Sequence, residues 1–252
     1  MGLPNQANHG VPSPTGTGFF VSHDGWFVTA AHVVTTNGTP DGPIRSDIDK
    51  AWLMKENRQV GPSAMCQFVS LDSVLPEIDL ALLKVDFAQN SNKDWLKTRS
   101  EFPFLQISVR ELEEGDSVYS FGYPLSETTA HFNGGMVFGS TSLCPRVTSA
   151  IVSSTMERTK MFTTGGDPKT YVLDKALNYG NSGGPILSVE TGHVHALCSR
   201  FQPLHVPQLH LQDANGNYPL VMIPSLYGIV SRLDNEAAVQ LFNSRGIPIV
   251  DL

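Results

Sequence analysis

The sequence lacks the features that mark several large classes of protein. Its 252 residues contain only 17 lysines and arginines against 24 aspartates and glutamates, a formal net charge of −7. No basic cluster is present that could neutralise phosphates, so we expect no nucleic-acid partner. No apolar run approaches the ~20 residues that a membrane-spanning helix requires. The N-terminus has no basic stretch followed by an apolar one. We therefore expect neither a membrane segment nor a secretory signal.

Cysteine is also scarce. Cys66, Cys144 and Cys198 are an odd number, so a disulfide framework would leave one cysteine over. Each lies among apolar or strand-forming neighbours, which favours three buried thiols in a reducing compartment and hence a cytoplasmic location. No CxxC or HExxH motif accompanies the histidines, so we expect no metal site and no cofactor.

What the chain does contain is a long series of short apolar segments separated by Gly, Pro, Asn and Asp, typical of an all-β protein. Asp24-Gly25 and Asn215-Gly216 each predict a hairpin turn. The least apolar connecting segment, 91–116, is where we divide the chain into two β-subdomains. A short helix is also possible within 92–102.

A C-terminal helix is predicted over about 234–245. Asp234 is a candidate N-cap, apolar residues follow at helical spacing, and Gly246 is a stop signal. The whole chain is then one domain of residues 1–252, with a first β-subdomain over about 15–100 and a second over about 112–232.

Three short motifs carry residues suited to catalysis. "FVTAAHVV" places His32 directly after an apolar strand, "PEIDLALLKV" places Asp79 at the head of another, and "GNSGGP" places Ser182 among glycines. A serine hydroxyl needs a base to take its proton as it attacks. Histidine, which ionises near pH ~6.5, can accept that proton and return it to a leaving group. A buried carboxylate fixes the imidazole tautomer.

In this order, "TAAH", "DLALL" and "GNSGGP" resemble the chymotrypsin-fold, or trypsin-like, serine peptidases. The segments "LDKALNYGNSGGPIL" and "GDSVYSFGYPL" are similar to the HtrA/Deg-like branch of that family. The resemblance runs from about residue 15 to 245. It implies a two-barrel chymotrypsin-like fold with a C-terminal helix. It also implies a serine endopeptidase that acts on protein or peptide substrates through an acyl-enzyme and needs no cofactor. Because the sequence ends soon after the C-terminal helix, we expect no PDZ domain.

The resemblance also implies a role for particular residues. Ser182 matches the nucleophile, His32 the general base and then acid, and Asp79 the orienting carboxylate. The backbone N–H groups of Gly180 and Ser182 match the oxyanion hole. Ser199 matches the serine or threonine that hydrogen-bonds the catalytic aspartate.

The specificity pocket departs from trypsin, because Ala176 stands where a trypsin-like enzyme has an acidic residue. With Leu177 beside it, this position implies a small or medium apolar P1 residue. Ser199 and Arg200 are the other candidate pocket residues. The proline-rich segment 200–224 is long for the family and could form a lid or an extended substrate-binding edge.

Three other interpretations were weighed. An α/β-hydrolase elbow needs a helix after the serine and the order Ser, acid, His, whereas Gly183, Gly184 and Pro185 follow Ser182 here. We therefore reject it. A catalytically silent or activator-dependent binding module on the protease fold stays open, as does a narrowly specific esterase with the same mechanism. The sequence does not determine the oligomeric state.

Overall fold

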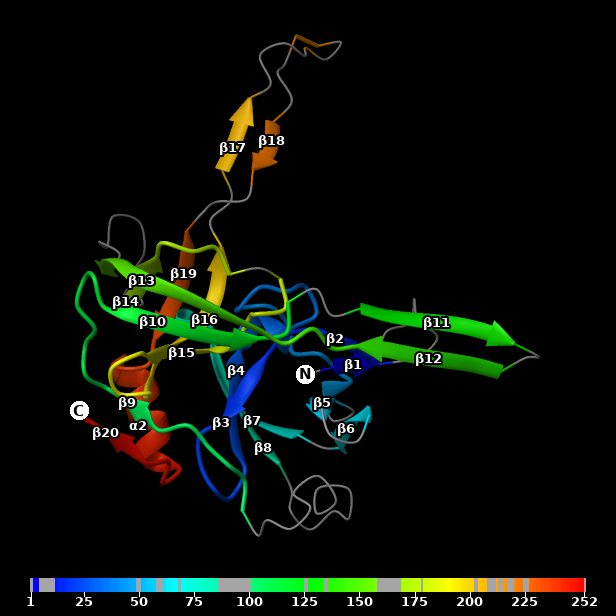
Figure 1. The fold of residues 1–252 in the computed structure, drawn as a ribbon, viewed down its shortest axis with the longest axis horizontal. Coiled ribbons are helices and arrows are strands. Elements are labelled where there is room, and N and C mark those ends of the chain that lie inside the picture. Colours follow the sequence, from blue (N-terminus) through cyan, green and yellow to red (C-terminus); the bar gives the residue numbers. More distant parts are fainter. Residues whose placement is uncertain are drawn as a thin grey trace.

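The computed structural model has a mostly β-stranded fold, which confirms the all-β prediction (Figure 1). It describes residues 2–4, 12–48, 51–57, 61–67, 69–85, 101–124, 127–133, 136–157, 169–177, 179–201, 204–207, 212, 215–216, 220–223 and 227–251. Among these residues there is one α-helix, α2, which lies near the C-terminus. No helix in this described part is long and apolar enough to cross a membrane.

The second half of the chain forms a closed six-stranded antiparallel barrel. Its strands follow one another around the barrel, and the last pairs with the first. In spatial order they are β15 (Pro185–Ser188), β10 (Ser117–Gly122), β13 (Arg146–Glu157), β14 (Lys169–Leu173), β19 (Gly228–Arg232) and β16 (Val194–Phe201). Two short strands, β9 (Ile107–Ser108) and β20 (Ile249–Val250), extend this sheet beyond β16.

The described strands of the first half form two four-stranded sheets. The first contains, in spatial order, β3 (Gly18–Phe20), β4 (Trp26–Ala30), β8 (Leu80–Val85) and β7 (Val69–Leu75). The second contains β2 (Pro12–Pro14), β1 (Gly2–Pro4), β5 (Trp52–Asn57) and β6 (Gly61–Gln67). The boundaries predicted for the two subdomains stay a prediction.

Two further hairpins project from this body in Figure 1. One consists of β11 (Glu127–Asn133) and β12 (Met136–Ser142), the other of β17 (Leu204–Pro207) and β18 (Leu220–Ile223). The second contains the predicted turn at Asn215-Gly216, and the turn at Asp24-Gly25 joins β3 to β4. Both glycines have positive φ, 83° and 99° respectively. Both hairpin predictions are confirmed.

The C-terminal helix α2 spans Glu236–Ser244, so the predicted helix is confirmed with slightly shorter bounds. The predicted N-cap is wrong, because Asn235 rather than Asp234 caps the helix by accepting from the Ala237 N–H. Asp234 instead accepts from Arg232 Nε at 2.9 Å, and this ion pair competes for its carboxylate. The helix predicted within 92–102 lies almost entirely outside the described residues.

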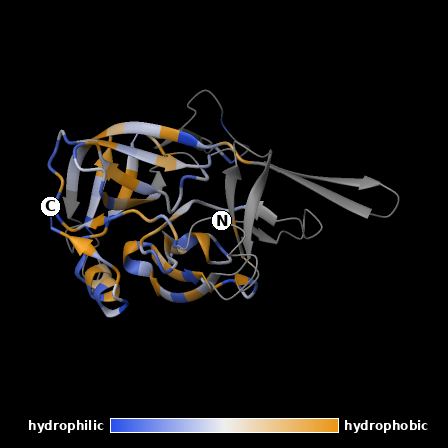
Figure 2. Ribbon diagram, turned by 60° about the horizontal axis from the view of Figure 1, so that its bottom comes forward, coloured by the Kyte–Doolittle hydropathy of each residue, from blue (hydrophilic) through white to orange (hydrophobic). Residues whose placement is uncertain are grey.

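The described residues form two apolar clusters, of which the second joins the two halves. One fills the interior of the barrel and includes Val118, Tyr171 and Ile186. The other joins the strands of the first half to the outside of the barrel and to buried α2 residues such as Phe242. In Figure 2 hydrophobic residues (orange) recur along the strands of both halves and along α2. Because this shared core fixes the two halves relative to each other, side chains from both halves can form one site with a defined geometry.

The prediction of three buried thiols is only partly right. Cys198 is buried and Cys144 is half-buried, and neither forms a disulfide. The side chain of Cys66 lies outside the described residues. Cys144 follows β12 in a stretch without regular secondary structure, and no apolar face covers it fully.

Candidate active site

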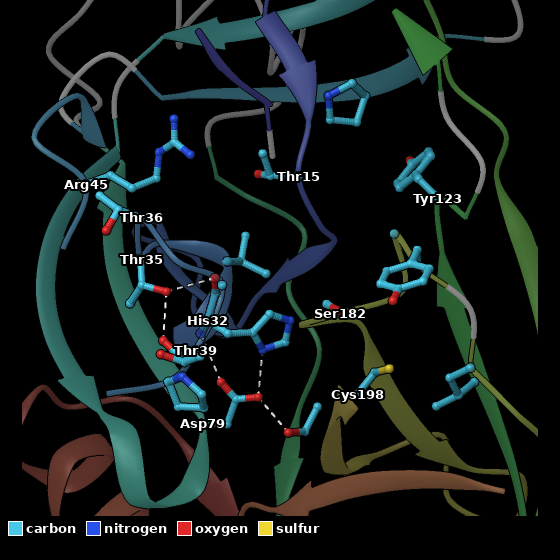
Figure 3. Close-up of a pocket in the computed structure, with 18 residues that line it drawn as sticks. Thr15, His32, Thr35, Thr36, Thr39, Arg45, Asp79, Tyr123, Ser182 and Cys198 are labelled. Atoms are coloured by element: carbon cyan, nitrogen blue, oxygen red, sulfur yellow. Dashed lines mark hydrogen bonds and ion pairs between the residues drawn. The ribbon is translucent and has the colours of Figure 1, made fainter. Parts of the chain in front are cut away.

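A pocket of about 680 Å3 opens where the two halves meet, and all three motifs contribute to it (Figure 3). Its lining comes from residues before 80 and from residues after 122. They are Pro14, Thr15, His32, Val33, Thr35, Thr36, Gly38, Thr39, Pro40, Arg45, Asp79, Tyr123, Leu177, Tyr179, Gly180, Ser182, Cys198 and Ser199.

Strand pairing brings His32 and Asp79 together. Strands β4 and β8 are antiparallel neighbours, and the end of one, Ala30, lies opposite the start of the other, Leu80. His32 follows β4 within a short 3₁₀ helix, η2 (Ala31–Val33), and Asp79 directly precedes β8. Residues 47 positions apart in the chain therefore meet at one edge of the sheet.

The contact between them is twofold. Asp79 Oδ2 lies 2.8 Å from His32 Nδ1, and Asp79 Oδ1 accepts from the His32 backbone N–H at 2.9 Å. The Asp79 side chain is only 8% exposed, whereas the His32 side chain is 19% exposed. A carboxylate oxygen can only accept, so Nδ1 carries the proton and Nε2 is left as the basic nitrogen.

The backbone of Asp79 has a left-handed conformation. It ends a second 3₁₀ helix, η4 (Pro76–Ile78), with φ 52° and ψ 42°, a left-handed conformation that L-residues other than glycine, asparagine and aspartate seldom adopt. Among the described residues it is the one non-glycine with positive φ. The Asp79 N–H donates to the Pro76 carbonyl at 3.1 Å and the Asp79 carbonyl accepts from the Ala31 N–H at 3.0 Å, so hydrogen bonds on both sides hold this backbone conformation.

Ser199 completes a chain of hydrogen bonds behind the histidine. Its Oγ donates to Asp79 Oδ2 at 2.6 Å, and the bond is buried. Along β16 the pairing with β19 shifts between Cys198 and Arg200, which leaves Ser199 as an unpaired extra residue. A bulge of this kind changes the direction of a side chain relative to its strand neighbours.

Ser182 lies in the turn between β14 and β15. In Figure 3 it is on the side of the His32 imidazole opposite Asp79. Its carbonyl accepts from the Thr17 N–H at 2.8 Å, and the next residue, Gly183, donates to the Cys198 carbonyl at 2.7 Å. The turn that carries the serine is thus tied to both halves of the molecule.

Glycine is required at Gly183 by space as well as conformation. Its φ is 81°, and a Cβ there would lie 2.3 Å from Thr29 Oγ1 and 2.4 Å from the Thr17 carbonyl oxygen. Any side chain would push the serine turn away from the first half. The hydrogen bonds among the described residues leave the N–H groups of Gly180 and Ser182 without a protein acceptor. Within the described part of the chain, these two donors are therefore available to a ligand.

The remaining wall of the pocket is largely uncharged. Leu177 is 3% exposed and packs in the barrel cluster with Cys198. Burial, and then the nearby charge of Asp79, raise the pKa of the Cys198 thiol well above its usual value. A thiol so held stays protonated, which makes Cys198 a poor nucleophile.

The pocket prediction from sequence agrees with the structure only in part. Leu177 and Ser199 line the pocket, whereas Ala176 is half-buried and is not among the lining residues. Arg200 continues β16, but its side chain lies outside the description. Within the described residues, no three His, Cys, Asp or Glu side chains are grouped to hold a metal ion.

Sequence reasoning missed Thr17. It is 2% exposed and lies against the serine turn, although 165 positions separate it from Ser182. The only signal in the sequence is its place between two glycines ahead of an apolar strand, in "GTGFF".

A basic imidazole held by a buried carboxylate and facing a serine among free N–H donors is the arrangement of the chymotrypsin-like serine peptidases. This chain belongs to the trypsin-like peptidase domain family, whose sequence profile matches residues 16–197.

The relatives include HtrA proteins, as the motifs predicted. The chain is 28% identical over 182 residues to serine protease HTRA1 of Xenopus laevis and 26% identical over 185 residues to serine protease HTRA4 of Mus musculus. These matches cover 71% and 73% of this chain but only 30% and 29% of the relatives. The chain therefore spans less than a third of the length of the curated relatives it matches.

Among solved structures the chain is similar to the HtrA-type protease AlgW. With AlgW bound to a decapeptide the TM-score is 0.53 at 19% identity, over 93% of this chain and 52% of that one. With AlgW bound to a tripeptide the TM-score is 0.50 at 19% identity, and the match covers 91% of this chain and 55% of the AlgW chain. At this identity the likeness shows the fold.

Proposed function

We propose that this protein is a serine endopeptidase whose catalytic residues are His32, Asp79 and Ser182. The observation that carries the proposal is the chain of hydrogen bonds from Ser199 through Asp79 to His32, with Ser182 in the same pocket. Family membership of residues 16–197 supports the same activity.

The reaction would begin with attack of Ser182 Oγ on a peptide carbonyl. His32 Nε2 takes the serine proton, and Asp79 stabilises the imidazolium that results. The imidazolium then protonates the leaving amine, which departs and leaves an acyl-enzyme on Ser182. His32 next activates a water that hydrolyses the ester and restores the serine.

The developing oxyanion would be bound by the N–H groups of Gly180 and Ser182. Both residues line the pocket, and neither N–H is used within the described protein. Removal of one such preorganised donor typically lowers kcat by about 10²- to 10³-fold.

The lining of the pocket supports an apolar P1 residue in the substrate. Leu177 and Cys198 are apolar and buried, and the single acidic lining residue, Asp79, is already hydrogen-bonded to His32 and Ser199. No described lining carboxylate is thus free to bind a basic side chain. A protein or peptide substrate follows from the endopeptidase assignment, and AlgW, the structural neighbour, was solved with peptides.

The test is labelling with a fluorophosphonate followed by intact-mass analysis, together with cleavage of fluorescein-labelled casein. The wild type should gain one adduct, and Ser182→Ala should gain none and lose roughly 10⁶-fold in kcat. Ser120→Ala is the matched control, because Ser120 is buried and its Oγ has no partner among the described residues. It should react like the wild type.

Two results would contradict the proposal. A loss below tenfold in Ser182→Ala would mean that another residue is the nucleophile. No adduct and no cleavage with the wild type would favour an activator-dependent or catalytically silent binding module on the same fold.

A further inference from the structure

Thr17 occupies a junction between the two halves of the molecule. It is 2% exposed and directly precedes β3 of the first half. Its N–H donates to the Ser182 carbonyl at 2.8 Å, and its own carbonyl accepts from Thr29 Oγ1 at 2.7 Å. Its backbone is therefore fixed on both sides, by the serine turn and by β4.

The Thr17 hydroxyl bridges two other backbone groups. It donates to the Gly180 carbonyl at 2.5 Å and accepts from the Tyr123 N–H at 3.1 Å. A hydroxyl has one donor and two acceptor lone pairs, so a single Oγ1 can satisfy both groups. Gly180 and Tyr123 both line the pocket.

Gly180 has little room to adopt another position. Its φ is 95°, and a Cβ there would lie 2.5 Å from the Tyr123 carbonyl oxygen and 3.0 Å from Pro124 Cα. The Thr17 hydroxyl holds the carbonyl at one end of this residue while Tyr123 and Pro124 confine its Cα. The direction of the Gly180 N–H relative to that carbonyl depends on both the φ and the ψ angle of the residue, so a held carbonyl and a confined Cα restrict the directions that the N–H can take.

We propose that Thr17 is a positioning residue for catalysis, whose hydroxyl holds Gly180 in the orientation that directs its N–H at the oxyanion. The inference rests on the proposed peptidase function. Thr17 does not line the pocket and acts only through Gly180 and Tyr123. Its effect should therefore be larger on the transition state than on substrate binding.

The test separates the hydroxyl from the volume of the side chain. Thr17→Val keeps the β-branched shape but leaves the Gly180 carbonyl and the Tyr123 N–H without their partner. Thr17→Ser keeps the hydroxyl. Thr170→Val is the matched control, because Thr170 is also a buried threonine, 5% exposed, but lies in the barrel wall on β14 and is not among the pocket-lining residues.

The readouts are kcat and KM for casein cleavage, the rate of fluorophosphonate labelling, the melting temperature, and the affinity of two Ala-Ala-Pro-Val peptides. One peptide ends in an aldehyde, which Ser182 converts to a hemiacetal whose oxygen occupies the oxyanion position. The other ends in the corresponding alcohol, which forms no such oxygen.

Thr17→Val should lower kcat and the labelling rate about 10- to 100-fold, with KM changed less than about threefold. Thr17→Val should lower the affinity for the aldehyde peptide by a similar factor. The affinity for the alcohol peptide should stay within about threefold of that of the wild type. Thr17→Ser and Thr170→Val should stay within about threefold of the wild type in every activity readout.

Equal weakening of aldehyde and alcohol, or a lower melting temperature with unchanged kcat, would overturn the proposal and leave Thr17 a structural residue. Failure of the peptidase function itself would give a different result, because the wild type would then react with neither fluorophosphonate nor casein. That outcome overturns both proposals.

Discussion

Replacement of Asp79 by asparagine exchanges one carboxylate oxygen for an NH2 group, and the structure determines what that exchange does. Three donors converge on the carboxylate. The His32 backbone N–H reaches Oδ1 at 2.9 Å, and His32 Nδ1 and Ser199 Oγ reach Oδ2 at 2.8 Å and 2.6 Å. An amide has only one oxygen acceptor, so it cannot accept hydrogen bonds at both the Oδ1 and the Oδ2 position.

Of the two amide orientations, one is clearly better. If the amide oxygen occupies the Oδ2 position, the NH2 group faces the His32 backbone N–H, and a hydrogen bond to a charged group worth about 1.5–3 kcal/mol is replaced by a clash between donors. If the oxygen occupies the Oδ1 position, the NH2 group faces His32 Nδ1 and Ser199 Oγ. The Ser199 hydroxyl can rotate to accept, and Nδ1 can accept once its proton moves to Nε2.

The second orientation keeps every hydrogen bond but puts the imidazole in the wrong tautomer. Nε2 then carries a proton and cannot act as a base for Ser182. We therefore expect Asp79→Asn to melt within about 3 °C of the wild type, because the hydrogen bonds survive and 1 kcal/mol shifts the melting temperature of a domain this size by about 2–4 °C. The kcat should fall about 10⁴-fold, the loss that the same change causes in the chymotrypsin template.

The assay is casein cleavage and fluorophosphonate labelling, with melting curves of the same samples. Asp24→Asn is the control, because Asp24 also accepts two side-chain hydrogen bonds, from Ser22 Oγ at 2.5 Å and Lys84 Nζ at 2.6 Å, but is exposed and remote from the pocket. Burial opposes ionisation of Asp24, but the bonds from Lys84 and Ser22 outweigh it and lower its pKa. Full activity in Asp79→Asn, or inactivity together with a collapse of the melting temperature, would refute the tautomer argument.

Two further predictions concern stability. His195 is 3% exposed, its Nδ1 donates to the Arg110 carbonyl at 2.9 Å, and burial lowers its pKa. In the unfolded chain this histidine is protonated below pH ~6.5, whereas in the folded chain it stays neutral to a lower pH. The folded state is therefore not destabilised by His195 above pH ~6.5, and it loses stability as the pH falls below that value. The drop in melting temperature between pH 7.5 and 5 should therefore be smaller in His195→Asn, which can keep the bond to Arg110, and an equal drop in both proteins would count against this. Arg232 is 1% exposed and pairs with Glu111 at 2.6 Å and with Asp234. In Arg232→Met the largely buried Asp234 carboxylate loses its closest partner, which should cost about 3 kcal/mol in urea unfolding, and a loss under about 1 kcal/mol would show that the pair contributes little.

The sequence predicted those parts of the molecule that depend on neighbouring residues. Each predicted turn at an Asp-Gly or Asn-Gly pair lies between two antiparallel strands, and its glycine has the positive φ that this residue type readily adopts. The C-terminal helix was predicted from its apolar spacing, but its first residue was not, because Arg232 competes for the Asp234 side chain. An N-cap is a local feature only where no tertiary partner takes the capping side chain.

For the candidate site, the sequence alone determined the residue types and their order, since a nucleophile, a base and an acid each need a particular chemical group. Only the tertiary structure decided how those groups are held. The bulge at Ser199 depends on the register between β16 and β19, and the contact of Thr17 with Gly180 joins residues 163 positions apart. Register and contacts between distant residues depend on how whole sheets pack together, and no short stretch of sequence contains that information.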